Sequence, residues 1–275
     1  MIEDIPSSLP APHRRFLSRA LDVLAADPRI VGVAAGGSYA TNTMDEFSDL
    51  DLVIAVEPDA HAAVLAAAKS IAATLGPLLA AFTGEHVGEP RLLICLYDEP
   101  LLHVDLKFVA LADVARRVED PAVLWQRGRR LSDALAAGEA RYPSPDPQWI
   151  EDRFWVWVHY VASKLARGEV FEAIESLNFL RVAVLGPLGL QRAGLRPTGV
   201  RRVEAQAPAL ARALRSTVAA HDARGCAVAL RAAAELYRSL RDGSPGLEVR
   251  RDAEKAALRY LDAVEQRIDV GQRRM

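Results

Sequence analysis

The sequence predicts an α+β protein, with a mixed sheet flanked by helices in the first half and a bundle of helices in the second. Three observations lead to this prediction. Short apolar runs typical of strands alternate with helical stripes over the first half of the chain. A segment with three prolines, residues 143–147, then interrupts both patterns, because proline fits neither a helix interior nor a sheet interior. Beyond it, apolar residues recur almost entirely at the helical period.

The first predicted domain covers residues 1–142. Arg14–Ala26 carries the apolar stripe of a helix, and the strands Arg29–Ala35 and Leu50–Val56 follow with a glycine turn between them. An alanine-rich helix is expected to end near Leu75. The apolar stretch that contains it, Ala62–Phe82, is interpreted as a buried helix, because charged and helix-breaking residues interrupt it too often for a membrane span. The other expected elements are a loop at Gly84–Pro90, strands at Arg91–Tyr97 and Leu101–Ala110, an edge strand at Ala122–Gln126, and short helices at Leu111–Arg117 and Leu131–Ala137.

The second predicted domain, residues 148–275, follows the proline-rich linker 143–147 and consists of five helices. Gly168 is expected to cap the first helix, and Gly186-Pro187 is expected to end the second. The expected helices are Trp149–Arg167, Glu169–Leu185, Pro208–His221, Arg224–Arg241 and Leu247–Ile268.

Charge and cysteine content narrow the class of partner. The 275 residues carry 34 Lys and Arg against 36 Asp and Glu, a net charge of −2. Residues 1–146 hold 13 basic and 21 acidic residues, a net −8, whereas residues 147–275 hold 21 and 15, a net +6. The acidic first half argues against long nucleic acid as a partner.

Cys95 and Cys226 lie in apolar stretches without metal-ligand spacing, and the N-terminus does not resemble a signal peptide. These two features predict a cytoplasmic protein with reduced cysteines.

Two closely spaced carboxylates stand in the most informative stretch, residues 34–56. Asp49 and Asp51 occupy positions i and i+2 of a predicted strand, so both point to one face while Leu50 and Leu52 point to the core. Two carboxylates side by side repel each other at neutral pH. A cation between them removes this repulsion, and hard oxygen ligands suit Mg²⁺. The spacing therefore predicts one or two Mg²⁺ ions at Asp49 and Asp51.

Gly36-Gly37-Ser38 precedes these carboxylates in the same stretch. Consecutive glycines allow a tight turn and a close approach of another group to the backbone. Ser38 is expected at a helix N-terminus, where free N–H groups attract phosphate. A phosphate cradle facing a carboxylate pair is the minimum apparatus for phosphoryl or nucleotidyl transfer. The alternative interpretation is an ordinary glycine turn beside an acidic strand end.

A third carboxylate, Asp105, stands in the middle of the predicted strand Leu101–Ala110. If this strand packs beside Leu50–Val56, the apolar faces of both strands share one core, and Asp105 lies on the face that carries Asp49 and Asp51. The alternative is a half-solvated sheet whose polar face meets water.

These motifs resemble those of a known superfamily. Gly37-Ser38 followed by Asp49-x-Asp51 is similar to the signature of the polymerase-β-like nucleotidyltransferases. The stretch GGSYATNTMDEFSDLDLVIAV, the strand VDLKFV and the helical segment that begins EDRFW resemble the aminoglycoside 6-adenylyltransferases, over about residues 30–185. VLWQRG stands where that family commonly carries an aspartate, which is replaced here by Gln126. The resemblance implies a third acidic residue, here Asp105, that acts as metal ligand or general base.

The resemblance also implies that the helical domain presents the acceptor. Lys164 could reach the triphosphate of the nucleotide, although a helical lysine is usually only solvated. The natural substrates of the family are polycations, and a cationic molecule favours an acidic receptor. The helical domain is basic instead, with a group of arginines that argues against streptomycin itself unless these residues belong to a solvated loop. They are Arg192, Arg196, Arg201 and Arg202.

The sequence thus predicts a Mg²⁺-dependent nucleotidyltransferase that moves a nucleoside monophosphate, AMP from ATP, onto a hydroxyl of a small molecule. An aminoglycoside-like antibiotic is the leading acceptor, and neither a membrane nor nucleic acid is expected as a partner. Two alternatives stay open, namely transfer to a nucleic-acid end or a protein, and a non-catalytic nucleotide-binding regulatory module. The predicted catalytic residues and metal ligands are Asp49, Asp51 and Asp105, and the predicted nucleotide-binding residues are Gly36, Gly37, Ser38 and Lys164.

Overall fold

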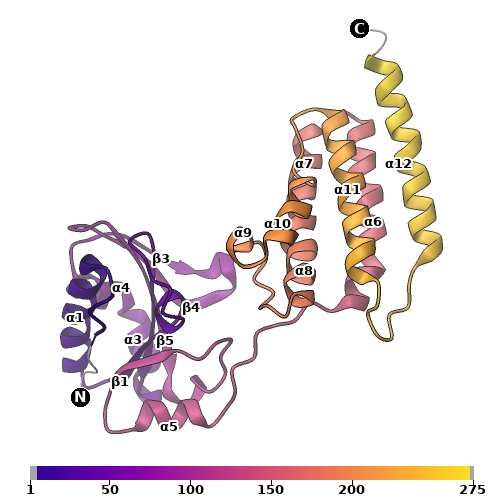
Figure 1. Ribbon diagram of the computed structural model, residues 1–275. Helices are drawn as coiled ribbons and strands as arrows, with labels where there is room; N and C mark the ends of the chain where they lie inside the picture. The colour runs from indigo at the N-terminus through magenta and orange to yellow at the C-terminus, as the bar shows by residue number, and fades with distance from the viewer. Residues whose placement is uncertain (1–4, 273–275) are drawn as a thin grey trace. The chain divides into compact units, whose positions relative to one another are not determined.

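The computed structural model describes residues 5–272 of the chain. The chain divides into two compact units, of which the first ends at Tyr142 and the second begins at Pro143. Residues 139–146, around this division, form neither helix nor strand. Figure 1 shows a sheet with flanking helices in the first unit and helices alone in the second. The α+β fold class predicted from the sequence is confirmed.

Six strands of the first unit form a mixed sheet in the order β3-β4-β5-β2-β1-β6. Neighbouring strands are antiparallel except for β2 and β5, which run parallel. The predicted edge position of β6 is confirmed. The strands are β1 (Ile30–Ala35), β2 (Leu50–Val56), β3 (Leu78–Gly84), β4 (Glu89–Tyr97), β5 (Leu102–Ala110) and β6 (Ala122–Gln126).

The two faces of this sheet have different surroundings. One face packs against α1 (Ala11–Ala26) and α4 (Ala68–Leu75) and forms the main core of the unit, which includes Leu52 and Ile54 of β2. A smaller cluster covers part of the other face and includes Leu131 of α5 (Arg130–Ala136). The rest of this second face carries the polar residues of β2 and β5. The alternation of apolar and polar residues along β2 and along β5 therefore separates a packed face of the sheet from a face that is open to a ligand.

The remaining helical elements of the first unit are short. They are the helices α2 (Gly37–Ala40) and α3 (His61–Ala66) and the 3₁₀ turns η1 (Pro58–Ala60), η2 (Glu85–Val87) and η3 (Leu111–Asp113). The helix expected at Leu111–Arg117 is thus wrong beyond one turn. Arg117 leaves the helical path and donates hydrogen bonds to the carbonyls of Ala115 and Leu135 instead.

Strand β3 corrects the interpretation of Ala62–Phe82 as a buried helix. The helical part ends at Leu75, because Gly76 is fully extended and the Pro77 that follows it cannot continue a helix. The chain then enters β3, which pairs with β4 in an antiparallel arrangement. Strand β4 begins at Glu89, inside the predicted loop. Alanine and leucine favour helix locally, so the sheet edge offered by β4 decides the conformation of β3.

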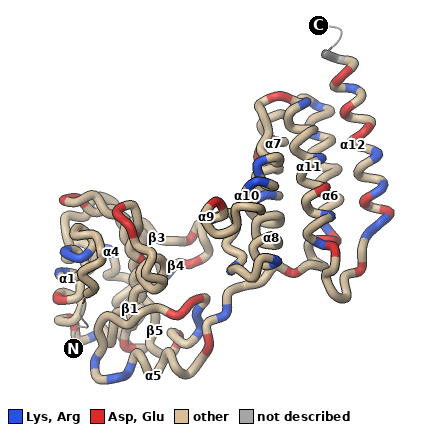
Figure 2. The backbone as a smooth tube through the Cα atoms, in the orientation of Figure 1, with Lys and Arg blue, Asp and Glu red and all other residues tan. Residues whose placement is uncertain are grey.

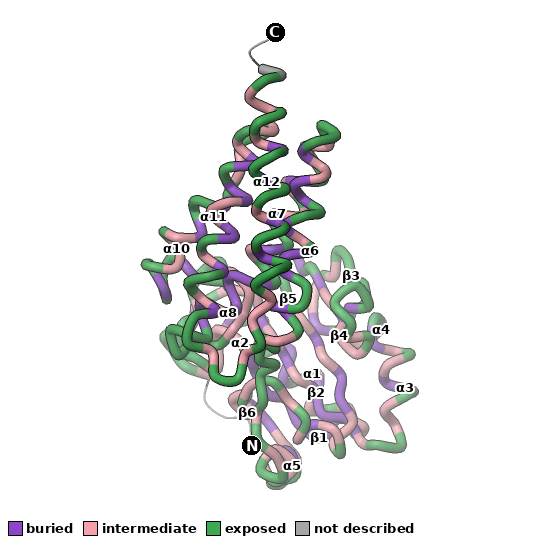
Figure 3. Tube along the Cα trace, turned by 90° about the vertical axis from the view of Figure 1, so that its right-hand side faces the viewer, coloured by how far each residue is buried: buried purple, intermediate pink, exposed green. Residues whose placement is uncertain are grey.

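The second unit consists of helices. Its longest elements, α6, α11 and α12, surround a core that contains Phe154, Tyr237 and Leu261. Figure 3 shows buried and exposed residues alternating along α11 and α12, as expected for helices that pack on one side. Along α12, acidic and basic residues alternate (Figure 2). The elements are α6 (Pro147–Ala166), α7 (Val170–Phe179), η4 (Leu180–Leu185), α8 (Gly186–Arg192), α9 (Val203–Gln206), α10 (Pro208–Arg215), α11 (Ala223–Arg241) and α12 (Arg251–Gln272).

The expected end of the second helix at Gly186-Pro187 is wrong. Helix α7 continues through the π-helical segment η4 into α8. Pro187 lacks the N–H that an α-helix would direct at the carbonyl four residues earlier, and the wider π turn immediately before it accommodates this loss. Gly186 has a packing role, since a Cβ there would lie 2.2 Å from the carbonyl oxygen of Gly199.

A buried carboxylate, Glu151 of α6, ties three helical elements together. It accepts hydrogen bonds from Tyr237 Oη at 2.5 Å, from Arg241 Nη1 at 3.0 Å and from the backbone N–H of Arg250 at 2.9 Å. Trp155 Nε1 donates a further bond at 3.2 Å. Burial acts to raise the pKa of Glu151, but the hydrogen bonds and the charge of Arg241 outweigh it and hold the pKa below its usual value.

The arginine group expected to make this unit basic includes one residue with a structural role. Arg192 donates hydrogen bonds to the backbone carbonyls of Ser239, Leu240 and Asp242, at the C-terminal end of α11. Cationic side chains at this end of a helix satisfy its last carbonyls and interact favourably with its dipole. Arg192 is therefore a helix cap.

One helical stretch is long and apolar enough to cross a membrane by length and composition alone. It is Val170–Arg192, 23 residues with a mean hydropathy of 1.3 in its most apolar window. Half of this window is buried inside the unit, and Ala173, Leu177 and Leu180 belong to the helical core. A core helix passes the same test of length and hydropathy, so the stretch is explained by packing within the unit.

Candidate active site

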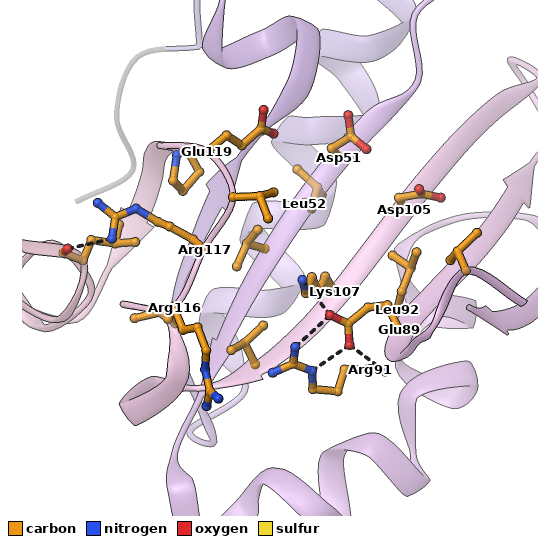
Figure 4. A pocket seen from close by; sticks show the side chains of 18 residues that line it. Asp51, Leu52, Glu89, Arg91, Leu92, Asp105, Lys107, Arg116, Arg117 and Glu119 are labelled. Carbon is orange, nitrogen blue, oxygen red and sulfur yellow. Dashed lines mark hydrogen bonds and ion pairs between the residues drawn. The ribbon is translucent and has the colours of Figure 1, made fainter. Parts of the chain in front are cut away.

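A pocket with a volume of about 450 Å³ lies on the open face of the sheet. Its walls come from β2, β4, β5 and the segment 114–121, all within the first unit. Figure 4 shows Asp51 and Glu119 at one end of the pocket and Asp105 on the neighbouring strand. Further along, Glu89 is joined to Arg91 and Lys107. The pocket thus has a carboxylate-rich end and an end with basic side chains.

Asp51 and Asp105 face this pocket from paired positions. The parallel register of β2 and β5 matches Asp51 with Asp105 and Leu52 with Leu106. Adjacent strands lie about 4.8 Å apart and partners in register point to the same face. The predicted pairing of these two strands, with both aspartates opposite the core, is therefore confirmed. His103 Nε2 lies 2.9 Å from Asp105 Oδ1 and holds that carboxylate from one side.

The glycine turn approaches Asp51 more closely than any other residue type allows. The backbone N–H of Gly36 donates to the carbonyl of Asp51 at 2.9 Å. Gly37 has a φ of +54°, and a Cβ there would lie 2.2 Å from Asp51 Oδ2. The left-handed backbone favours glycine at position 37, and the contact leaves no room for a Cβ. The expected tight turn with a close neighbour is thus present, and the neighbour is the carboxylate itself.

Ser38 follows this turn in α2. The helix that was expected to begin here is only four residues long, so its dipole is small and its exposed amides belong to the turn. Ser38 Oγ is buried and has no hydrogen-bond partner in the structure. A buried hydroxyl without a partner is costly, and an oxygen of a bound phosphate group would satisfy it.

Glu119 is one of the site residues that sequence reasoning missed, as are Glu89 and Arg91. Glu119 Oε1 accepts a hydrogen bond of 2.8 Å from the backbone N–H of Gly37. The same oxygen lies 2.6 Å from the place where a Cβ on Gly36 would stand. A carboxylate of the chain itself therefore sits on the amide predicted to bind phosphate. No motif in the sequence signals this contact, since 82 residues separate Gly37 and Glu119.

Four of the seven predicted site residues do not line the pocket, namely Gly37 and Ser38 of the turn, Asp49 and Lys164. Asp49 is half-buried and precedes β2 by one residue, so the regular alternation of the strand does not fix its direction. His13 of α1 anchors the neighbouring backbone, with Nε2 2.7 Å from the carbonyl oxygen of Ser48. Lys164 belongs to the second unit, where Nζ donates to Glu169 Oε2 at 2.8 Å. The hydrogen bond to Glu169 keeps the pKa of Lys164 above its usual value.

The basic end of the pocket is organised by Glu89. Arg91 donates two hydrogen bonds of 2.7 Å to its carboxylate, and Lys107 Nζ lies 2.7 Å from Oε2. The bonds from Arg91 above all, and then those from Lys107, lower the pKa of Glu89 to about 2 against the effect of burial. Glu89 is therefore ionised at neutral pH and fixes both cations on the pocket wall.

The donor set at the carboxylate-rich end fits a hard divalent cation. Within residues 5–272, no group of three or more His, Cys, Asp and Glu side chains is arranged to hold a metal ion. Asp51 and Asp105 supply two carboxylates from neighbouring strands. Mg²⁺ is usually held by one or two carboxylates together with waters and substrate phosphates. The pair therefore fits a Mg²⁺ ion that enters with a nucleotide.

Comparison with protein families identifies the domain that carries this site. Residues 17–108 match the family model described as a nucleotidyltransferase domain. The first unit contains a nucleotidyltransferase domain. The matched residues run from α1 to β5 and include the glycine turn, Asp51 and Asp105. The nucleotidyltransferase domain makes the chain an enzyme of this class, and nucleotidyl transfer is its general activity.

Two solved structures are similar to the chain over most of its length. One is an aminoglycoside 6-adenyltransferase from Bacillus subtilis, with 16% identity, a TM-score of 0.39, and coverage of 90% of this chain and 97% of that chain. The other is a nucleotidyltransferase-like protein from Exiguobacterium sibiricum 255-15, with 13% identity, a TM-score of 0.37, and coverage of 82% and 75%. A search of curated proteins finds no match. The assignment of the nucleotidyltransferase domain rests on the family model alone.

Proposed function

We propose that the protein is a Mg²⁺-dependent adenylyltransferase that moves AMP from ATP onto a hydroxyl of a small molecule. The observation that carries the proposal is the placement of Asp51 and Asp105 at paired positions beside the Gly37 turn. This arrangement sets two carboxylates next to a backbone amide and a buried hydroxyl, which together match a metal–triphosphate complex.

The triphosphate binds at the glycine turn in this proposal. The N–H of Gly37 and the hydroxyl of Ser38 donate to its oxygens. Support comes from the orphaned Ser38 Oγ and from the anion, Glu119, that already accepts from the Gly37 N–H. A phosphate group that binds here displaces the Glu119 carboxylate from that amide. Lys164 is a further candidate for the phosphates, at the cost of its bond to Glu169.

Asp51 and Asp105 hold the metal, and Asp49 is assigned to the same ion. The metal supplies positive charge that offsets the charge of the phosphates during transfer. Asp105 either completes the metal site or accepts the proton of the acceptor hydroxyl. His103 keeps Asp105 oriented in both cases, through the contact of 2.9 Å. The glycine turn fixes the backbone of Asp51, because the carbonyl of Asp51 accepts a hydrogen bond from the N–H of Gly36.

The acceptor is a small hydroxylated molecule that the helical unit helps to bind, and an aminoglycoside-like antibiotic is the leading candidate. Transfer to such a drug would confer resistance. The two buried cysteines carry no disulfide, which suits a cytoplasmic enzyme. Transfer to a nucleic-acid end or a protein, and nucleotide binding without turnover, are the competing outcomes.

A pyrophosphate-release screen tests the proposal. The purified protein is incubated with ATP, Mg²⁺ and a panel of aminoglycosides, lincosamides and other polyols, and product mass is measured for each positive acceptor. We expect release that requires both Mg²⁺ and an acceptor, with a mass gain of one adenylyl group. Nucleotide binding without pyrophosphate release across the panel would contradict the proposal in favour of a regulatory module. Release only with RNA or protein would contradict the small-molecule acceptor.

A further inference from the structure

Four aromatic side chains form a strip along α6 and α7 of the helical unit. The strip consists of Trp149, Trp157 and Tyr160 from α6 and Phe179 from α7. Ring centroids are 5.7 Å apart for Trp149 and Trp157 and 5.1 Å apart for Trp157 and Phe179. Trp149, Tyr160 and Phe179 are all more than a third exposed, at 47%, 42% and 42%. None of these three rings is buried in the helical core. Core packing therefore does not explain why aromatic residues occupy these positions.

A small pocket of about 170 Å³ opens in this strip. Its walls are the rings of Trp157, Tyr160 and Phe179, together with Val161 of the core and the polar residues Glu175 and Ser176. All six residues lie in α6 and α7. The volume suits a group of a few heavy atoms and is too small for a whole nucleotide or a sugar chain.

Two cations of the chain already lie on rings of the strip. The guanidinium of Arg153 is 4.2 Å from the centroid of the Trp149 ring. The ammonium of Lys164 is 5.0 Å from the centroid of the Tyr160 ring. Both distances are within the range in which the negative face of an aromatic ring attracts a cation. Two rings of the strip therefore already interact with cationic side chains of the chain itself.

Carboxylates complete the pocket. Glu175 contributes to its wall directly. Glu172, one turn earlier on α7, accepts a hydrogen bond of 2.7 Å from Tyr160 Oη and so fixes the orientation of that ring. Aromatic faces together with a carboxylate are the combination that recognises ammonium and guanidinium groups, because the rings attract the charge and the carboxylate neutralises it.

We propose that this aromatic pocket binds the ammonium or guanidinium group of a small organic cation. The binding itself is independent of catalysis. The assignment of that cation to the acceptor of the transfer reaction rests on the proposed function. On that assignment, the pocket selects acceptors that carry both a hydroxyl and a cationic group, and it explains how a unit with a net positive charge can still attract a cation locally.

The experiment compares choline with 3,3-dimethylbutan-1-ol, a neutral molecule of the same shape, in the full-length protein without nucleotide. Binding is followed by NMR through the indole N–H signal of Trp157, which is assigned by its loss in Trp157→Phe. We expect a saturable shift with choline and an affinity about tenfold weaker for the neutral alcohol, as one cation–π contact predicts. Glu175→Gln should weaken choline binding several-fold, whereas Glu235→Gln, at an exposed position on α11, should leave it unchanged.

Each outcome decides the proposal. Equal affinity for choline and the alcohol would show an apolar crevice without charge selection and would overturn it. The same applies to a shift that Glu175→Gln leaves intact or to the absence of any saturable shift. A shift that depends on protein concentration and is accompanied by dimerisation would assign the strip to contact between two copies. None of these results bears on pyrophosphate release, so the proposed transfer reaction stands or fails separately.

Discussion

The two units each contain a set of carboxylates, and the two sets differ in their surroundings. In the helical unit, Glu151 is completely buried and accepts hydrogen bonds from Tyr237, Trp155, Arg241 and the backbone of Arg250. In the first unit, Asp105 is 20% exposed and faces a pocket of about 450 Å³ together with Asp51. A carboxylate enclosed by protein donors holds helices together, whereas one at a pocket wall can be reached by a ligand that binds and leaves.

Burial of a charged group is therefore not by itself a sign of function. Glu151 has a perturbed pKa and a cationic partner, as many active-site groups do, yet its donors close it off from solvent. Asp51 and Glu119 lie against glycines that leave room for close approach. The pocket carboxylates differ from Glu151 in that a ligand can reach them and in the glycine backbone that lies beside them.

Loss of the buried carboxylate should have the largest effect. Glu151→Ala leaves the guanidinium of Arg241 with Glu254 as its remaining carboxylate partner, and it removes the acceptor of the buried Tyr237 hydroxyl and of the Arg250 N–H. We therefore expect the free energy of unfolding of the helical unit to fall by about 3–5 kcal/mol. Urea denaturation monitored by circular dichroism measures this change. The matched control is Asp152→Ala, which breaks a half-exposed pair with Arg250 and should cost less than about 1 kcal/mol. Equal losses in the two variants would contradict the conclusion that burial gives Glu151 its structural role.

Neutralising a pocket carboxylate should abolish activity and spare the fold. In Asp51→Asn we expect loss of most Mg²⁺-dependent ATP binding and a decrease in turnover of at least about a hundredfold, because a ligand of the metal is lost. Asp105→Asn should lower turnover similarly, and it should lower ATP binding as well only if Asp105 is a metal ligand. Calorimetry with Mg·ATP and the pyrophosphate assay separate these effects. Asp59→Asn, at an exposed position after β2, is the control. Wild-type ATP affinity and turnover in Asp51→Asn would exclude a metal role for Asp51.

Substitution of Gly37 can separate the effect of its left-handed backbone from the effect of its close contact with Asp51. Ala at this position requires the left-handed conformation and places a Cβ against Asp51 Oδ2. Gly128→Ala requires the same conformation, at φ +64°, but has no atom within 4 Å. Both variants should lose about 1–2 kcal/mol of stability, but only Gly37→Ala should lose activity, by about a hundredfold, since it displaces the proposed metal ligand Asp51. Thermal unfolding and turnover are measured together, and equal activity in the two variants would contradict the role of the contact.

Loss of the Glu119 carboxylate should have a smaller effect, on the affinity for Mg·ATP, and the direction of that change is informative. Because this carboxylate occupies the Gly37 amide, Glu119→Ala removes a competitor of the triphosphate. We expect the Kd of Mg·ATP to fall by about threefold to tenfold, which corresponds to the net contribution of one ordinary hydrogen bond. Glu139→Ala, at an 86% exposed side chain, should leave the Kd unchanged. Weaker ATP binding in Glu119→Ala would instead place Glu119 among the groups that hold the metal–nucleotide complex.

Glu89 should make the stability of the first unit depend on pH in the acid range. Its pKa is lowered to about 2 in the folded state, so its pairing stabilises the first unit fully above the pKa of an unfolded glutamate, about 4.3. That stabilisation is lost as the pH falls from about 5 toward 2, and we expect it to amount to about 1–2 kcal/mol at this partly exposed site. Glu89→Gln should flatten the dependence of the unfolding free energy on pH in this window. Glu46→Gln, at an exposed position, should retain the wild-type slope.

Much of the fold and part of the site could be predicted because they depend on local periodicity. The alternation of Leu50–Val56 and Leu101–Ala110 predicts which face carries Asp51 and Asp105, and the observed register confirms it. Periodicity failed where local preference and tertiary pairing disagree. Strand β3 is rich in alanine and leucine and forms only because β4 offers an edge, and Gly186-Pro187 continues a helix because a π turn precedes it.

The sequence by itself determined the two-part organisation, through the proline-rich segment and the change of period around it, and the strand faces that carry Asp51 and Asp105, through a repeat of two residues. The parallel pairing of those two strands was decided by the tertiary structure. Only the tertiary structure decided that Glu119 meets Gly37 across 82 residues and that Glu151 is enclosed by Tyr237 and Arg241. It also decided that rings from α6 and α7 form one aromatic strip. The physical reason is that side chains distant in sequence become neighbours through packing, and no periodic pattern in either segment records which partner the other will be.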